Sequence, residues 1–555
     1  MAAMLFVTAV LMATASAAVR PCGFDDADRS APASTPMAFS SKLSTVAAEG
    51  WLSKVQRLIR SDASLDVNAQ DEPSGWAALH AACHNGQASV VQALLERGAD
   101  PNIQTNDRRT PLHLAVLHGQ ADIVRMLMGA TLKDRIWMAV VRTTRDYADH
   151  SIVDQYGYTP LLYAVKLGHG DIVDVLLAAG ADPTARNSLN GWTAMHYAAA
   201  GGHATLISAL HGRVDASARS WRWRCTALHH AVLSNSIETV RRVARVLPSP
   251  SVMTSSFRTA LIDAGDEHGR SALMMAARYG EAAMVTYLLS AGAKLAAQDN
   301  VRSTVLHAAA CNPTVDVLVR VVGWWKAPSV GGIIGSAGQI LRRPTLDVVN
   351  ASGRTPFHEA AAIGLVKNVE LLLGAGASID RPDSRGQTAL HQAARFGHPD
   401  VVKLLLASGA HLGIVDRDRR TALHYAAEGG HVDAVRVLIA NDYPSTTACL
   451  RELAGFKGRP LDYLDAGMES ALSIAGRLGH TAVEEVLLDA GALTRSERLL
   501  RVSEHLIQIW ISHVLRHTPP SVITYLKNST LLHDVTLPVR LAITDGPARR
   551  PLAVI

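Results

Sequence analysis

The feature that most constrains the fold of this 555-residue chain is a short motif that recurs at a fixed interval. The segment TALHQA at 388–393 returns 33 residues later as TALHYA at 421–426. In each copy the Thr predicts the start of a short helix, and a glycine such as Gly397 predicts its end. A second helix with an apolar stripe follows. Because neither helix can bury its apolar face alone, the copies must stack.

The Thr position of the motif can be followed along most of the chain. It is occupied by Ala77, Thr110, Thr159, Thr193, Thr226, Ser271, Thr304, Thr355, Thr388, Thr421 and Ser470, and a poorer copy begins at Ser41. The pattern resembles the ankyrin repeat over roughly residues 40–495, and so many copies in phase argue against a chance match.

The resemblance implies an all-α fold, an ankyrin-repeat solenoid of stacked helix–turn–helix units with finger turns between them. We expect a signal-like or disordered extension over 1–36, the solenoid over 37–495, a C-terminal helix over 496–517 and a tail over 518–555. A possible split lies near 311–350, where Asn-Pro replaces the glycine that ends the first helix in other copies.

Four intervals between Thr positions are longer than the rest, and they follow the repeats at Thr110, Thr226, Thr304 and Thr421. Those repeats also lack the Gly-Ala pair that closes the second helix elsewhere, as at 409–410. We therefore expect four inter-repeat insertions, all leaving between the second helix and the next finger turn. They mark either a binding face or tolerated surface loops. The same reasoning predicts that a valine costs more at Gly409 than at Gly129.

The pattern changes after the last copy. Residues 496–515 have helical periodicity and predict a helical cap for the open face of the last repeat. The alternative is a docking segment similar to the SOCS box, which would make the chain a substrate-recruiting adaptor of a ubiquitin ligase. That box needs a cysteine in its first helix, which is absent here, and Leu537-Pro538 is a thin match to its second part.

The N-terminus and the cysteines bear on the compartment. Residues 5–18 form an apolar run ending in Ala-Ser-Ala, as in a secretory signal, but no Lys or Arg precedes the run. Five scattered cysteines without a C-x-x-C pair argue against a disulfide framework. Because proteins with such repeats mostly work inside cells, the expected location is cytoplasmic, with secretion as the alternative if residues 1–18 act as a signal. No apolar run is long enough for a transmembrane segment.

Motifs for catalysis are absent from the sequence. Most of the 24 histidines fall at fixed repeat positions, and in the Thr-x-x-His slot the resemblance implies a ring that bonds the Thr hydroxyl. There is no H-E-x-x-H, no G-x-S-x-G elbow and no dinucleotide fingerprint. We therefore expect no enzyme activity, no cofactor and no metal. A net charge of +5 does not call for nucleic acid, which leaves protein partners and no small-molecule substrate.

Partner proteins are the expected ligands of such an array, bound by the finger tips and the concave face of a non-catalytic interaction scaffold. The residue just before the Thr position is often aromatic or basic. The candidate contacts at this position are Trp76, Arg109, Tyr158, Trp192, Arg270, Arg354 and Arg420. Trp, Tyr and Arg are enriched at interface hot spots, so this row predicts a recognition surface.

The sharpest candidate is the finger Ser220–Arg224. By register, Trp221 takes the place of the Asp and Arg224 the place of the Gly of the usual turn, which predicts that this finger has lost its own turn chemistry. Trp221 and Trp223 should point to one side, with Arg222 and Arg224 on the other. Either the rings are exposed and anchor a partner, or the neighbouring insertion buries them.

Overall fold

The computed structural model describes residues 42–61, 65–129, 147–246, 261–326, 345–441, 463–492 and 494. The chain divides into two compact units, one ending at Ser378 and one starting at Ile379. This division lies beyond the split expected near 311–350. The predicted extension 1–36, most of each insertion, the helix 496–517 and the tail 518–555 lie outside the described residues.

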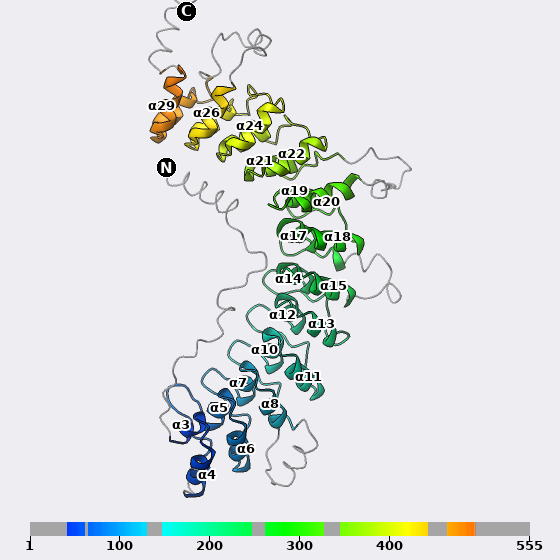
Figure 1. Ribbon diagram of the computed structural model, residues 1–555, viewed down its shortest axis with the longest axis vertical. Coiled ribbons are helices and arrows are strands. Elements are labelled where there is room, and N and C mark those ends of the chain that lie inside the picture. Colours follow the sequence, from blue (N-terminus) through cyan, green and yellow to red (C-terminus); the bar gives the residue numbers. More distant parts are fainter. Residues whose placement is uncertain are drawn as a thin grey trace, which may run out of the picture. The chain divides into compact units, whose positions relative to one another are not determined.

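Each repeat forms a pair of short helices, as the periodicity predicts, and the described residues contain helices but no strand. In the unit that ends at Ser378 the first helices are α3 (Lys42–Ala48), α5 (Ala78–His84), α7 (Pro111–Leu117), α10 (Pro160–Leu167), α12 (Ala194–Ala200), α14 (Ala227–Leu233), α17 (Ala272–Tyr279), α19 (Val305–Ala310) and α21 (Pro356–Ile363). Their second helices are α4 (Leu52–Ser61), α6 (Ala88–Glu96), α8 (Ala121–Leu127), α11 (Gly170–Ala178), α13 (Ala204–Ala209), α15 (Ile237–Val246), α18 (Ala282–Ser290), α20 (Val315–Lys326) and α22 (Val366–Gly374). Figure 1 shows these pairs stacked in chain order.

The unit that starts at Ile379 repeats this arrangement. Its first helices are α23 (Ala389–Arg395), α25 (Ala422–Glu428) and α28 (Ala471–Leu478), and its second helices are α24 (Pro399–Ala407), α26 (Val432–Ala440) and α29 (Thr481–Asp489). None of the described helices in either unit is long and apolar enough to cross a membrane.

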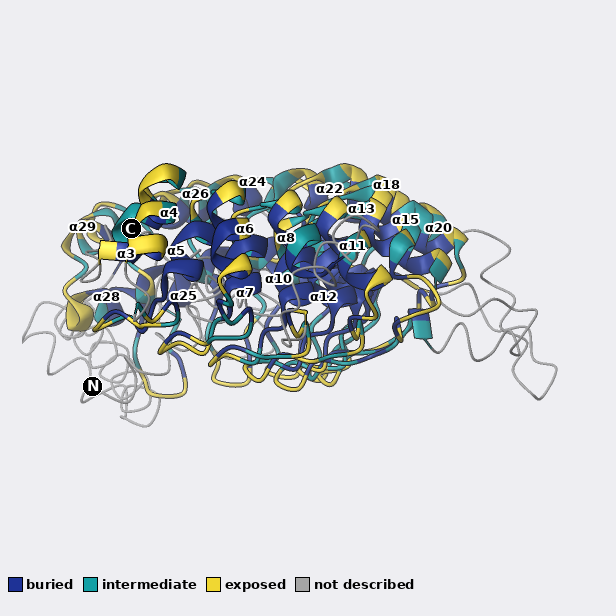
Figure 2. Cartoon of the chain, turned by 90° about the horizontal axis from the view of Figure 1, so that it is seen from below, coloured by how far each residue is buried: buried dark blue, intermediate teal, exposed yellow. Residues whose placement is uncertain are grey.

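The core of each unit lies between the helices of one pair and the next. In Figure 2 the second helices α6 and α8 form one edge of the unit that ends at Ser378, α5, α7 and α10 form the middle row, and the finger turns form the opposite edge. Alanines such as Ala115 on the first helices are fully buried, which lets neighbouring helices approach closely. Branched and long apolar side chains of the second helices, such as Leu176, fill the remaining space.

In most of the described repeats a histidine couples the first helix to the following finger. The repeat at Thr110 shows the pattern: the Thr110 N–H donates to His113 Nδ1 at 3.2 Å, and the Thr110 hydroxyl lies 2.9 Å from the same atom. Because Nδ1 accepts, Nε2 carries the proton and donates to the Tyr158 carbonyl at 3.1 Å. The Thr–His bond predicted from the motif is therefore confirmed. Burial lowers the pKa of His113 to about 4, so the ring is neutral at pH 7.

The ends of two second helices correct the predicted order of Gly129 and Gly409. Both glycines have left-handed φ, +57° and +91° respectively. A Cβ on Gly129 would lie 2.0 Å from the ring of Tyr147, whereas nothing lies within 4 Å of the same atom on Gly409. The structure therefore leads us to expect a larger cost for valine at Gly129. The prediction was wrong because Tyr147, at the far end of the insertion, packs back onto this glycine.

Two asparagines replace the missing glycine after α19. The side-chain amide of Asn312 donates to the carbonyls of Ala277 and Gly280, and that of Asn368 donates to the carbonyls of Ala310 and Asn312. Both asparagines are buried. This segment is held by side-chain hydrogen bonds where other repeats use a left-handed turn, which the sequence pattern alone did not indicate.

Candidate functional site

The groove surface is formed by three side chains of each repeat: the last finger residue, just before the Thr position, and the residues four and seven places after the Thr position on the first helix. These side chains contact one another. Tyr158 stacks on Tyr163 with ring centroids 4.6 Å apart, and the Arg420 guanidinium lies 5.9 Å from the Tyr425 ring centroid. The predicted row of partner contacts forms one of these three positions.

The aromatic members of that row are buried. Trp76, Tyr158 and Trp192 are 7%, 3% and 1% exposed, so these three rings lie in the core and not on the predicted recognition surface. The reason is visible at Trp192, whose ring lies 5.0 Å from Tyr197 and 4.2 Å from His230. Large side chains on two successive first helices close over it, and the ring becomes part of the core.

The basic members of the row pair with carboxylates. Arg270 binds Asp266 at 2.7 Å, Arg109 lies 3.8 Å from Asp154, and Arg354 lies 4.0 Å from Glu359. These three arginines are only partly exposed, as is Arg420. Their first role in the structure is to join fingers and helices.

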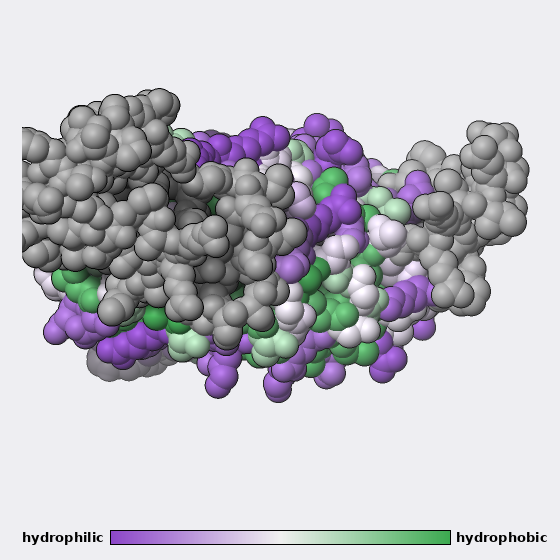
Figure 3. Space-filling view, turned by 90° about the horizontal axis from the view of Figure 1, so that it is seen from above, coloured by the Kyte–Doolittle hydropathy of each residue, from purple (hydrophilic) through white to green (hydrophobic). Residues whose placement is uncertain are grey.

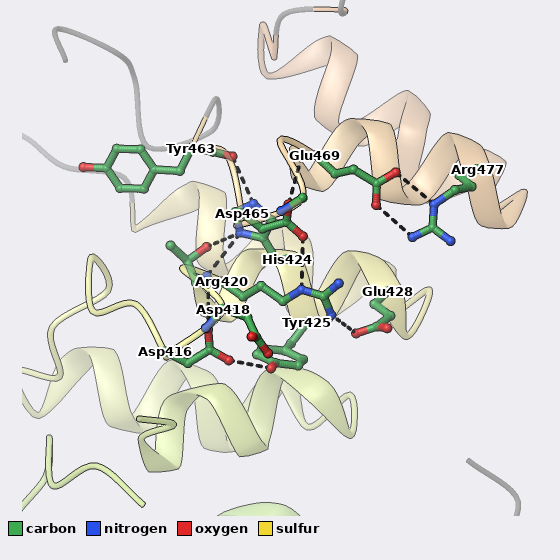
Figure 4. A network of polar contacts seen from close by, with 12 residues as sticks. Asp416, Asp418, Arg420, His424, Tyr425, Glu428, Tyr463, Asp465, Glu469 and Arg477 are labelled. Atoms are coloured by element: carbon green, nitrogen blue, oxygen red, sulfur yellow. Dashed lines mark hydrogen bonds and ion pairs between the residues drawn. The ribbon is translucent and has the colours of Figure 1, made fainter. Parts of the chain in front are cut away.

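Arg420 shows how such a pair extends into a network in the unit that starts at Ile379. Its guanidinium donates to Glu428 on α25 at 3.1 Å and to Asp465 of the next finger at 3.2 Å (Figure 4). The same figure shows the Tyr425 hydroxyl donating to Asp416 at 2.6 Å. Arg420 therefore ties two fingers and one helix together, and its charge is largely compensated within the fold.

The finger 220–225 has six residues, one more than the finger 383–387 from which its register was predicted. Ser220, not Trp221, takes the place of the turn-forming Asp: its N–H donates to the Cys225 carbonyl at 2.9 Å, and its hydroxyl accepts the Cys225 N–H at 3.0 Å. Arg224 does take the glycine place, with φ of +51°. The turn is thus intact, and the prediction that its chemistry is lost was wrong.

The extra residue places Trp221 at the tip of the finger. Trp221 is 59% exposed, and its ring lies over Gly191 of the preceding finger, where a Cβ would come within 2.4 Å. Trp223 is partly buried, with the Arg222 guanidinium 5.3 Å from its ring centroid. The structure therefore leaves one tryptophan of the predicted pair open to a partner and half-covers the other.

A ladder of backbone hydrogen bonds fixes the tips. The Trp221 N–H donates to the Asn190 carbonyl and the Glu267 N–H donates to the Trp223 carbonyl, both at 2.9 Å. Equivalent bonds join Asn106 to Ser74, Gln155 to Asp107, Ser188 to Tyr156, Asn300 to His268, Ala351 to Val301, Arg417 to Arg385 and Ala466 to Asp418. The tip that carries Trp221 is therefore held on both sides, which gives an exposed ring a fixed position.

Family models agree with this geometry. Models of ankyrin repeats match residues 43–136 and 335–416 (three copies), 161–211 (many copies), and 268–300 and 418–447 (single repeats). The chain is an ankyrin-repeat protein. Ankyrin repeats are in general protein–protein interaction modules.

Several curated ankyrin proteins resemble this chain over the repeats. It is 29% identical over 358 residues to the E3 ubiquitin-protein ligase KEG of Arabidopsis thaliana, covering 61% of this chain and 19% of that protein. It is 29% identical over 143 residues to the human transient receptor potential cation channel subfamily A member 1, covering 25% and 11%. A third relative is the Xenopus laevis neurogenic locus notch homolog protein 1, 33% identical over 134 residues, covering 24% and 5%. These matches thus span less than a quarter of each relative.

Metal-binding and reactive side chains are the remaining kinds of site. In the described ranges, no group of three or more His, Cys, Asp or Glu is placed to hold a metal ion. Cys83 and Cys311 are free and buried, and burial raises the pKa of the Cys311 thiol to about 12. Cys225 is disulfide-bonded. In the view of Figure 3, small groups of hydrophobic residues lie between hydrophilic ones on the described surface.

Proposed function

We propose that this chain is a non-catalytic scaffold that binds a partner protein, with the finger 220–225 as a principal contact. The observation that carries the proposal is the exposed Trp221 ring on a tip fixed by backbone bonds to both neighbouring fingers. A tryptophan at the centre of an interface commonly contributes more than about 2 kcal/mol when it is covered by a partner. Because the ring is already held in place, little conformational freedom is lost on binding.

The arginines around the ring support the same surface. Arg222 is exposed beside Trp223, and Arg224 is exposed at the glycine place of the turn. Arg is the other residue type that concentrates at hot spots, and it pairs with carboxylates and backbone carbonyls of a partner. The other arginines of the row are half-exposed, and their charges are paired within the array; they are Arg109, Arg270, Arg354 and Arg420. We assign them to the rim of the interface, where they exclude water but contribute less to affinity.

The test compares Trp221→Ala with a matched variant, Trp51→Ala, which removes a similarly exposed tryptophan just before α4. Full-length proteins carrying either change are used to capture partners from cells that express the protein, with quantitative mass spectrometry. Trp221→Ala should lose the partners that wild type captures, whereas Trp51→Ala should keep them. Equal retention by both variants, at unchanged melting temperatures, contradicts the proposed contact.

The alternative role is that of a substrate-recruiting adaptor of a ubiquitin ligase. It is supported by the similarity of the repeats to those of a plant ubiquitin ligase, and it depends on residues 496–555, which lie outside the described residues. Deleting residues 496–555 separates the two roles. A docking segment predicts a folded array that loses one set of partners, and a capping helix predicts an array that aggregates.

A further inference from the structure

A hollow of about 310 Å³ opens on the groove surface of the unit that ends at Ser378, between the repeats at Ser271, Thr304 and Thr355. We call it the Ser303 hollow. It exists because two groove positions of the middle repeat carry the small residues Ser303 and Ala308. The repeat before it has the longer side chains of Arg270 and Met275 at these positions, and they form one wall of the hollow. The volume is near the lower end of the range for ligand pockets, about 300–1,000 Å³.

The charges that line the hollow are mostly used within the fold. Arg270 is paired with Asp266 at 2.7 Å. The Asp299 carboxylate accepts the backbone N–H groups of Val301 and Ser303 at 3.0 and 2.7 Å, as the turn of its own finger requires. The Arg270 charge is therefore compensated within the fold, and Oδ1 of Asp299 is engaged by its own finger.

The opposite wall is paired more loosely. Glu359 on α21 lies 4.0 Å from the Arg354 guanidinium and accepts from the Asn350 amide at 3.5 Å, both near the limit for such contacts. It is nevertheless engaged from its own repeat. Glu359 therefore shapes the edge of the hollow, and its charge acts on Arg278 without a direct ion pair.

Arg278 differs from these groups. It stands at the third groove position, on α17, with its guanidinium 5.7 Å from the Tyr279 ring centroid. It lines the hollow and is partly buried, with Cys311, Tyr279 and Glu359 as electrostatic neighbours, but it forms no ion pair with any residue that the structure describes. Arg270, at the finger position of the same repeat, has a carboxylate partner. Among the described groups of the wall, the Arg278 guanidinium is thus the one that a carboxylate would satisfy in bidentate geometry.

We propose that the Ser303 hollow receives an acidic side chain, Glu or Asp, from a segment of the partner protein that lies along the groove. This inference rests on the proposed scaffold function and names the chemistry of one of its contacts. The partner carboxylate binds Arg278, and the methylene groups of the same side chain pack against Val301 and Ala308. A neutral or basic side chain is rejected, because it would cover the Arg278 charge without compensating it.

The test uses a displayed library of random twelve-residue peptides selected on the full-length protein. We expect selected peptides to share one acidic position, and Arg278→Glu should weaken a chosen acidic peptide at least tenfold. The charge-reversed protein should instead select peptides with Lys or Arg at that position. The matched control is Arg395→Glu, because Arg395 occupies the same groove position on α23 and also contacts aromatic rings, Phe396 and Tyr425. It should leave the acidic preference unchanged.

Two further variants test the hollow without changing its charge and guard against a charge-reversed protein that does not fold. Ser303→Tyr fills the hollow while Arg278 stays in place, and it should abolish the acidic preference at an unchanged melting temperature. Arg278→Gln replaces Arg278→Glu if the reversal does not fold. Peptides that bind equally well to Arg278→Gln and wild type overturn the inference but leave the scaffold function standing. A wild-type protein that selects no peptide, and whose captured partners are insensitive to Trp221→Ala, contradicts both.

Discussion

Two neighbouring fingers, 187–192 and 220–225, have the same length and the same backbone bonds but treat a tryptophan in opposite ways. In both turns the first residue donates its N–H to the carbonyl of the last, and its side chain accepts the N–H of that last residue. Trp192 is the last residue of its finger and is 1% exposed, whereas Trp221 follows the first residue of its finger and is 59% exposed. For these two tryptophans, position within the repeat and not residue type decides whether the ring belongs to the core or to the surface.

The two fingers should differ most in the stability that is lost when each tryptophan ring is removed. Trp192→Ala leaves a cavity between Tyr197 and His230 and should lower the free energy of unfolding by about 3–5 kcal/mol. Trp221→Ala should lower it by about 1 kcal/mol or less, since most of the ring is already in water. Urea unfolding of the full-length chain measures both. Similar midpoints for the two variants would contradict the assignment of Trp192 to the core.

The glycine beneath Trp221 links the two fingers. Gly191 has φ of +70° and its Cβ would lie 2.4 Å from the Trp221 ring, whereas Gly180 has φ of +93° and open space. Gly191→Val should therefore cost backbone strain of about 1–3 kcal/mol plus displacement of the ring, and Gly180→Val the strain alone. In a Trp221→Ala background the difference in thermal stability between the two valine variants should disappear. A difference that persists in that background shows that the ring is not its cause.

Replacing His230, which packs on Trp192, should increase the stability of the protein. Its ring is fully buried, and neither nitrogen has a hydrogen-bond partner among the residues that the structure describes. Met275 occupies the same repeat position on α17, so His230→Met is compatible with the packing and should stabilise the protein by about 1–3 kcal/mol. Calorimetry of the two proteins at pH 7 measures the gain, and a loss of stability would show that the imidazole is held by a bond that methionine cannot replace.

The same substitution has a defined pH dependence. Burial holds the pKa of His230 well below 6.5, so the unfolded state binds more protons as the pH falls below 6.5. His230 therefore subtracts increasing amounts of stability on acidification, and the advantage of His230→Met should grow from pH 7 to pH 5. An advantage that stays constant over this range would contradict the depressed pKa.

The smallest expected effect concerns the glycine place of the two turns, which is Gly191 in one finger and Arg224 in the other. Arg224 has φ of +51°, a conformation that costs a non-glycine residue about 1 kcal/mol. Arg224→Gly should remove that strain but free the unfolded chain, for a net gain of about 0.5 kcal/mol. Arg224→Lys keeps the strain and should be neutral. A lower melting temperature for the glycine variant than for the lysine variant would contradict the strain.

The fold could be predicted from the sequence because each repeat carries its own local signals. The Thr cap, the histidine three residues later and the left-handed glycines are all short-range, and eleven copies average out the exceptions. The candidate site was less predictable. One extra residue moved Trp221 from the base of its turn to the tip, and Ser220 could form the turn in place of Asp. The burial of Trp192 depends on Tyr197 and His230 from two different repeats, which no single repeat reveals.

The histidine bond that joins most first helices to the following finger has a consequence for how the array unfolds. The bond of His196 to the Cys225 carbonyl and that of His229 to the Arg270 carbonyl each join one repeat to the next, so their free energy belongs to the junction and to neither repeat alone. Unfolding of one repeat therefore weakens the junctions on both of its sides, which makes unfolding of neighbouring repeats cooperative. Burial lowers the pKa of both rings, so protonation of these imidazoles at acidic pH favours the unfolded state. Because the same bond recurs at many junctions, acid should weaken them together, and interior repeats should unfold as readily as terminal ones.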